Sequence, residues 1–203
     1  RYSSGNFYEL GVNFIDEKFK WERLKVPFAN STIPLSMNFQ EGYTTEINLQ
    51  SDAWVHSLFD LMTEGTVFLI DYGMTEAEYF HPQRSQGTLK CFSKHKSNND
   101  PFSDIGSQDI TASVNFSNVA RSAKECGFEV AGYTTQSMFL ISLGIENYLK
   151  NEENEEKKVK IAQEIKQLVL PGAMGEVFKV MALSKKQSVK LDGFKELDLR
   201  GRL

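Results

Sequence analysis

The run TVFLID, residues 66–71, constrains the fold more than any other stretch of this chain. It contains four consecutive apolar residues, and Gly65 and Gly73 bound it. A short apolar run between glycines is typical of a strand that is covered on both faces, as in a parallel sheet. Such a strand needs helices above and below it, so we expect an α/β protein.

Helical and strand-like patterns alternate around this run. Residues 51–65 carry apolar side chains at helical spacing, with Ser51 as the expected N-cap and Gly65 as the helix stop. Further helices are expected at 115–127, with Asn115 as the N-cap and Gly127 as the helix stop, and at 137–149 and 151–170. Further strands are expected at 128–136 and 176–183. This alternation is the pattern of a layered α/β fold, in which ligands bind beyond the carboxyl ends of the strands.

The first residues follow a different pattern. Segments 6–14 and 18–26 alternate apolar or aromatic residues with polar ones, which predicts a β-hairpin. We therefore expect a hairpin and loop insertion at 1–45 and an α/β domain at 46–203. Within the second domain, the stretch 73–110 is expected to be mostly loop, interrupted only by a short strand at 88–92, and it is too long for a mere connector. We expect it to be a substrate-facing loop that is partly mobile without a partner.

Composition and charge argue against several classes of protein. The chain has 203 residues, a net charge of −4 and an isoelectric point near 5.5, which disfavours non-specific nucleic-acid binding. No apolar run approaches the roughly 20 residues of a membrane-spanning helix. The sequence opens without a signal peptide or an Arg-rich leader, although its first residue is not Met. Cys91 and Cys126 are far apart, which predicts free thiols and a reducing compartment.

The nonapeptide HPQRSQGTL, residues 81–89, gathers hydrogen-bond donors, acceptors and a glycine downstream of the 66–71 strand. A loop that grips a ligand needs such groups, because glycine lets the backbone come close and polar side chains can hydrogen-bond. Two interpretations remain open for the charged residues. Asp71 is either an orienting carboxylate or a turn-capping residue, and Arg84 is either a substrate anchor or part of a structural ion pair.

Other chemistries find weaker support in the sequence. His81, Cys91 and His95 suggest a metal site, but no fourth ligand stands at a usual zinc spacing, and we expect no metal. A Ser-His-Asp hydrolase would need the elbow G-x-S-x-G, which the sequence lacks. The sequence also lacks G-x-G-x-x-G and the P-loop pattern, and PGAMGE at 171–176 precedes a strand instead of following one.

Several long motifs carry a resemblance to a known family. They are IDYG at 70–73, HPxRxxGTLxCF at 81–92, QDITA at 108–112, FLxxLGI at 139–145, MGExFKVMALSK at 174–185 and GFxxxDLR at 193–200. With them the sequence resembles the MidA family of S-adenosylmethionine-dependent methyltransferases, which includes a mitochondrial complex I assembly factor that methylates a protein arginine. The resemblance covers nearly the whole chain. Met74, Ser113 and Asn115 depart from it, because the family usually has His, His and Asp there.

The resemblance implies the C-terminal half of a class I methyltransferase, a Rossmann-like sheet with helices on both faces and a reversed last strand at 176–183. S-adenosylmethionine would be bound mainly by an N-terminal half with the glycine-rich motif, so this chain alone should be inactive. A carboxylate near an acceptor guanidinium would orient it and localise its lone pair. The expected catalytic residues are Asp71, Tyr72 and Asp109, and the expected substrate-binding residues are Arg84, Gln86, Gly87, His95 and Thr111.

The implied partner is a protein substrate, such as a respiratory complex I subunit, and the chain is compatible with a homodimer. The implied compartment is the bacterial cytoplasm or the mitochondrial matrix. A second hypothesis, from a different class, is a non-catalytic assembly or protein-binding module, since a fold does not fix a function. A glycine-rich turn after a strand in upstream sequence would favour the enzyme.

Overall fold

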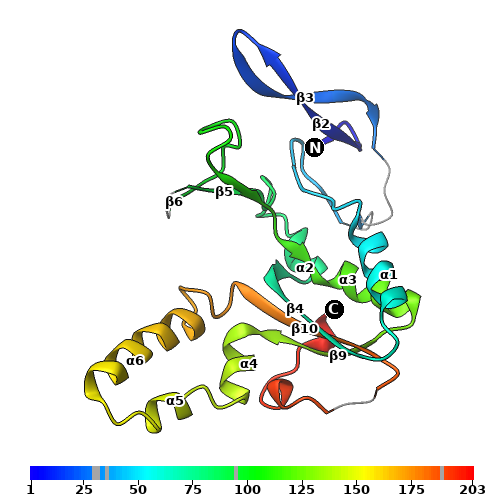
Figure 1. Cartoon of the computed structure of the whole chain (residues 1–203). Helices are drawn as coiled ribbons and strands as arrows, with labels where there is room; N and C mark the ends of the chain where they lie inside the picture. The colour runs from blue at the N-terminus through cyan, green and yellow to red at the C-terminus, as the bar shows by residue number, and fades with distance from the viewer. Residues whose placement is uncertain (29–32, 35–36, 94–95, 188–189) are drawn as a thin grey trace. The chain divides into compact units, whose positions relative to one another are not determined.

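The structure is a computed structural model that describes residues 1–203 except 29–32, 35–36, 94–95 and 188–189. Its elements, which can be followed in Figure 1, fall into two compact units. Unit 1 consists of residues 1–48 and 77–113, and unit 2 consists of residues 49–76 and 114–203. Both units are discontinuous in sequence. They therefore differ from the division expected at residue 46, because most of the 73–110 stretch groups with the N-terminal segment.

Unit 1 begins with a three-stranded sheet of order β1–β2–β3. Its strands are β1 (Tyr2–Ser3), β2 (Asn6–Ile15) and β3 (Lys18–Pro27). β2 and β3 are antiparallel, with Val12 opposite Trp21 and Phe14 opposite Phe19. The two turn residues Asp16 and Glu17 have positive φ, as the favoured two-residue hairpin turns require.

A second sheet of unit 1 forms inside the stretch expected to be mostly loop. Its central strand is β5 (Lys90–Ser93), which pairs with β6 (Lys96–Asn98) and β7 (Asp109–Thr111). The short helix α2 (Glu76–Tyr79) precedes it. The sequence predicted only a strand near 88–92, because strands of three residues carry too little periodicity to be recognised.

Unit 2 is built on a four-stranded sheet of order β8–β4–β10–β9. The strands are β4 (Gly65–Met74), β8 (Val114–Asn115), β9 (Glu129–Thr135) and β10 (Phe178–Lys185). β10 is antiparallel to β4 and to β9, whereas β8 is parallel to β4. The reversed last strand that the resemblance implied is therefore confirmed.

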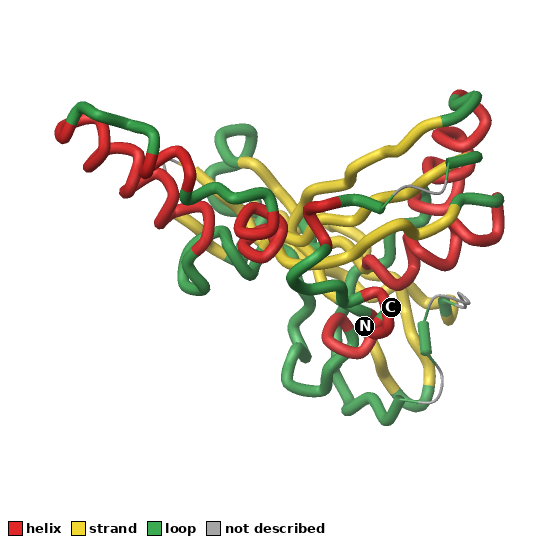
Figure 2. Tube along the Cα trace, turned by 90° about the horizontal axis from the view of Figure 1, so that it is seen from below, coloured by secondary structure: helices red, strands yellow, loops and turns green. Residues whose placement is uncertain are grey.

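Helices cover both faces of this sheet (Figures 1 and 2). One face packs against α1 (Ser51–Leu61) and α3 (Phe116–Cys126), and the other against α4 (Gln136–Ser142) and the 3-10 helix η1 (Asp192–Phe194). Residues of β10 alternate between the two cores, as side chains of a strand must. Met181 and Leu183 enter the first core, and Val180 and Ala182 enter the second; all four are fully buried.

Several helix ends differ from the expected ones. Ser51 is the first residue of α1 and not its N-cap, which is Gln50, and Gly65 begins β4 at a φ of 130°. The helix expected at 137–149 is interrupted at Gly144, whose φ is 76°, so α4 is followed by a separate α5 (Asn147–Lys150). α6 (Glu155–Val169) and a final 3-10 helix η2 (Arg200–Arg202) complete unit 2. In the part of the chain that the structure describes, no helix is long and apolar enough to cross a membrane.

Candidate functional site

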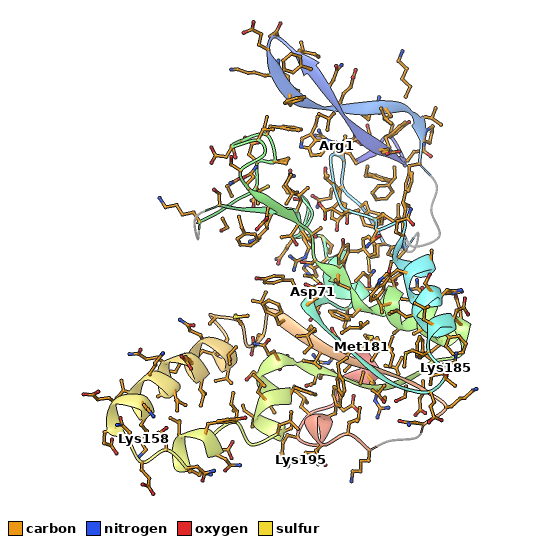
Figure 3. All side chains as sticks on the ribbon, viewed as in Figure 1. Arg1, Asp71, Lys158, Met181, Lys185 and Lys195 are labelled. Atoms are coloured by element: carbon orange, nitrogen blue, oxygen red, sulfur yellow. The ribbon has the colours of Figure 1, made fainter. Side chains whose placement is uncertain are left out.

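Asp71 and Tyr72 lie near the carboxyl end of β4, in unit 2, where Figure 3 labels Asp71. The Asp71 side chain is exposed, and its Oδ1 accepts a hydrogen bond from the backbone N–H of Tyr72 at 2.7 Å. Across the ladder, Asp71 lies opposite Lys179, and the centre of the Tyr72 ring lies 4.0 Å from that of Phe178, with the two rings tilted by 38°. The local hydrogen bond fits the capping interpretation of Asp71, while its exposure leaves the carboxylate accessible to a ligand.

One edge of β4 is open along most of its length. β10 pairs with residues 65–72 on one side, whereas β8 reaches only the last two residues of β4 on the other. Between residues 65 and 72, no strand of the described residues pairs with that second edge. The side chains of Phe68 and Ile70 are 44% and 53% exposed. An apolar strand with such an edge offers unpaired backbone groups to another strand.

The carboxylate of Glu46 organises the HPQRSQGTL loop of unit 1. Its Oε2 accepts hydrogen bonds from the backbone N–H and the hydroxyl of Thr88 at 2.7 and 2.8 Å, and its Oε1 accepts one from the N–H of Leu89 at 3.3 Å. A Cβ on Gly87 would lie 2.2 Å from Oε1. We call this group, Glu46 with Gly87, Thr88 and Leu89, the Glu46 clasp. The close approach expected at Gly87 is therefore made to a side chain of the protein itself, and the sequence patterns did not reveal Glu46.

Two buried tyrosines support the same loop. The hydroxyl of Tyr79 donates to the backbone carbonyl of Glu46 at 3.1 Å, and the hydroxyl of Tyr43 donates to the carbonyl of His81 at 3.5 Å. Burial raises the pKa of Tyr79 to about 12, and burial also raises the pKa of Tyr43. Both hydroxyls therefore remain protonated donors at neutral pH.

Arg84 and Gln86 lie in a hollow beside the Glu46 clasp. The hollow has a volume of about 400 Å³ and is lined by residues between Glu78 and Gly87. The Nε of Arg84 donates to the backbone carbonyl of Glu78 at 3.1 Å, and Gln86 pairs with Thr44 in an isolated parallel bridge. Among the described residues, no ion pair includes Arg84. The interpretation of Arg84 as part of a structural ion pair therefore has no support among these residues.

The remaining expected site residues are placed as follows. Asp109 and Thr111 are the end residues of β7, opposite Phe92 and Lys90 of β5. They belong to unit 1 together with Arg84, Gln86 and Gly87, whereas Asp71 and Tyr72 belong to unit 2. That all of them form one site stays a prediction. His95 lies outside the described residues.

No group of three His, Cys, Asp or Glu side chains that could hold a metal ion occurs among the residues that the structure describes. Cys91 is fully buried and Cys126 is partly buried, and both are free thiols. The polar residues that unit 2 presents stand instead at the carboxyl end of a strand flanked by helices. This is the arrangement of a ligand-binding α/β protein.

Comparison with known proteins identifies the family. The model of the family described as "Putative S-adenosyl-L-methionine-dependent methyltransferase" matches residues 1–134, and the chain belongs to this family. Two solved structures of a COG1565 superfamily protein from Burkholderia thailandensis, one native and one bound to S-adenosyl-homocysteine, are each 33% identical to it with a TM-score of 0.91. They match 99% of this chain, which spans only 53% and 55% of theirs. No curated protein matches the chain.

The cofactor of this family is S-adenosylmethionine, and its carboxylate typically needs open backbone amides near a glycine. The backbone N–H of Gly73, the glycine that follows Asp71 and Tyr72, is not open, because it donates to the carbonyl of Val177 at 3.4 Å. A Cβ on Gly73 would lie 2.5 Å from both the Phe116 ring and the carbonyl oxygen of Val114. Here glycine serves the packing of α3 against β4. The residues at the end of β4 therefore do not by themselves fit the amino-acid end of the cofactor.

Proposed function

We propose that this chain is the C-terminal half of a MidA-type methyltransferase that methylates a nitrogen of a protein, with arginine as the acceptor. The observation that carries the proposal is the family match over residues 1–134 together with the similarity of 99% of the chain to a protein solved with S-adenosyl-homocysteine. The choice of arginine rests on the resemblance of the motifs to the MidA family.

The open edge of β4 supports the assignment to a C-terminal half. A further strand beside residues 65–72 would satisfy the backbone groups of that edge and reduce the exposure of Phe68 and Ile70. The solved relatives are nearly twice as long as this chain, so the additional length could supply that strand. The sheet would then continue on the far side of β4 from β10.

Each expected catalytic residue has a proposed task. The cofactor supplies an electrophilic methyl group, and transfer to a nitrogen gains most from holding the two reactants in line. The Asp71 carboxylate would accept hydrogen bonds from the acceptor guanidinium and so localise a lone pair on the reacting nitrogen. Tyr72 would help to orient the acceptor beside Asp71, and Asp109 of unit 1 is the alternative orienting carboxylate.

Unit 1 presents a surface that suits a protein acceptor better than a small molecule. Phe14, Phe19 and Trp21 stand on one face of the β2–β3 hairpin and are between 41% and 61% exposed. The ring of Phe102, from a distant part of the sequence, lies 5.0 Å from the ring of Trp21. Exposed aromatic surface of this kind is typical of protein interaction sites. A respiratory complex I subunit is the candidate that the resemblance suggests.

The test is a methylation assay with the full-length protein, labelled S-adenosylmethionine and cell extract. We expect one labelled protein band that carries methylarginine. Asp71→Asn should lower its labelling by about ten- to a thousand-fold, the range for a lost orienting group, with little change in cofactor affinity. Asp16→Asn, in the hairpin turn, is the matched control. Labelling of a small molecule only, or full labelling by the Asp71 variant, would refute the proposal.

A further inference from the structure

We infer that the hollow lined by residues 78–87 binds a carboxylate, namely the acidic side chain of the polypeptide that accepts the methyl group. The identity of that polypeptide rests on the proposed function. The hollow itself lies within a single loop of unit 1, so its geometry is given by that unit alone. Its donors, its rigidity and its charge each contribute to the inference.

Arg84 is the principal donor of the hollow. Its Nε is held by the carbonyl of Glu78 at 3.1 Å, and its backbone N–H is held by the carbonyl of His81 at 2.8 Å. In contrast to Arg121 and Arg200, it has no carboxylate partner among the described residues. A guanidinium fixed through Nε keeps its two terminal nitrogens for a ligand, and this planar pair matches the two oxygens of a carboxylate.

His81 supplies a second donor. Its Nδ1 accepts a hydrogen bond from the backbone N–H of Gln83 at 3.3 Å. An accepting Nδ1 places the proton of the neutral imidazole on Nε2, which is then a donor. Ser85 and Gln86 line the same hollow, and a serine hydroxyl and a glutamine amide can also donate. The lining is therefore rich in donors for an acceptor-only ligand such as a carboxylate.

The chain segment that lines the hollow is held by backbone hydrogen bonds on both sides. The N–H of Gly87 donates to the carbonyl of Arg84 at 3.1 Å, and the N–H of Thr44 donates to the carbonyl of Ser85 at 2.8 Å. The Glu46 clasp fixes the next residues. A binding site that is already ordered loses little conformational entropy when its ligand arrives. Glu46 would thus position Arg84 without touching the ligand.

The charge of the lining favours a single negative charge carried on a larger partner. Among the described residues that line it, Arg84 is the only Lys or Arg and Glu78 is the only acidic residue. One guanidinium beside a carboxylate suits a monoanion better than a dianionic phosphate, and it predicts weak binding of a free small anion. A volume of about 400 Å³ suits a side chain presented on a polypeptide.

Two short peptides test the inference by NMR, through the amide shifts of residues 81–87 of the protein. The probes are acetyl-Gly-Arg-Gly-Glu-Gly-amide and the same peptide with Gln in place of Glu. We expect the Glu peptide to bind about tenfold more tightly, as for the loss of one charge-assisted contact. Arg84→Gln should remove that difference. Arg84→Lys should retain only part of it, because an ammonium lacks the planar fork. Lys25→Gln, which removes the same charge from unit 1, should leave it unchanged.

Equal affinity for the two peptides, or shift changes outside residues 81–87, would overturn the inference. So would tighter binding of inorganic phosphate than of the Glu peptide in the same titration, because the hollow would then be a phosphate site. The measurement needs neither cofactor nor methyl transfer. A full-length protein that discriminates the peptides but transfers no methyl group would refute the proposed function alone. One that methylates protein but binds both peptides equally would refute only the carboxylate site.

Discussion

Glu46 and Gly87 are held in mutual contact: the carboxylate of Glu46 occupies the space in which a side chain at position 87 would begin. The distance from Oε1 of Glu46 to an ideal Cβ on Gly87 is 2.2 Å, and the φ of Gly87 is 77°. The loop that carries Arg84 and Gln86 is therefore shaped by a residue about 40 positions earlier in the chain. A small substitution at either end of this contact should affect stability in a measurable way.

Gly87→Ala should destabilise the protein by about 3 kcal/mol, from the left-handed backbone conformation and from the displaced carboxylate. Gly106→Ala is the matched control, since Gly106 has a similar φ of 79° but nothing within 4 Å of its ideal Cβ. It should cost only the backbone strain, about 1 kcal/mol. Chemical unfolding of both variants measures the difference. Equal losses would mean that the Glu46 contact contributes nothing.

Glu46→Gln should cost about 1–3 kcal/mol, because the amide cannot accept all the hydrogen bonds of the carboxylate and turns an N–H₂ group toward another donor. Thr88 is buried, so its unmet donors cannot recover by binding water freely. Glu9→Gln, at an exposed position of β2, is the control and should be nearly neutral. Thermal unfolding followed by circular dichroism compares the two. A Glu46 variant as stable as the control would contradict the role of the clasp.

The pKa of Tyr79 predicts a loss of stability at alkaline pH. Its pKa is raised by burial to about 12 in the folded protein, compared with an ordinary value of 10.0. Because the pKa is higher in the folded protein, the tyrosine of the unfolded chain ionises first. The part of the folding stability that depends on the neutral hydroxyl is therefore fully present below pH 10 and is lost as the pH rises to 12. Two pKa units correspond to about 3 kcal/mol. The Tyr79→Phe variant has no hydroxyl to ionise at this position. The unfolding free energy of the wild-type protein should therefore fall by about this amount relative to that of the variant between pH 10 and 12. A constant difference would refute it.

Lys185 closes the carboxyl end of α1 within unit 2. Its Nζ donates to the carbonyl oxygens of Phe59 at 2.5 Å and Met62 at 2.6 Å, and it lies 3.7 Å from the centre of the Phe59 ring. Lys185→Met should cost about 1–3 kcal/mol, since it leaves helix-end carbonyls without a cationic donor. Lys195→Met, at an exposed position also labelled in Figure 3, is the control. Equal midpoints of urea unfolding for the two variants would argue against the cap.

The sequence predicted the parts of this fold that depend on local patterns. The helix from Phe116 to Cys126 begins and ends where Asn115 and Gly127 indicated, because capping is decided by neighbouring residues. The predicted end of α1 at Gly65 was wrong: the helix ends at Leu61 with Met62 as its C-cap. The side chain that binds the carbonyls at this end belongs to Lys185, more than 120 positions further along the chain. No periodicity can reveal such a partner. A cap of this kind is a tertiary contact.

The candidate site shows the same division. Gly87 and Arg84 could be chosen from residue type, since a glycine in a polar loop indicates close backbone approach. The sequence could not predict which group lies against Gly87. The structure shows that it is the carboxylate of Glu46. The strands β6 and β7 were missed for a related reason. They have only three residues each, and their stability comes from pairing with β5 and not from their own composition.

The last prediction concerns the cofactor. Residues 1–203 alone should not bind S-adenosylmethionine with micromolar affinity, although the chain belongs to a family that uses it. The sequence has no glycine-rich turn between a strand and a helix, and the space at Gly73 is filled by the ring of Phe116. Without such a turn, no set of free backbone amides meets the carboxylate of the cofactor. Calorimetric titration of these residues should give no saturable heat at about 100 μM, whereas the full-length protein should bind at low micromolar concentration. Micromolar binding by residues 1–203, with a stoichiometry near one, would show that this half carries the cofactor site after all.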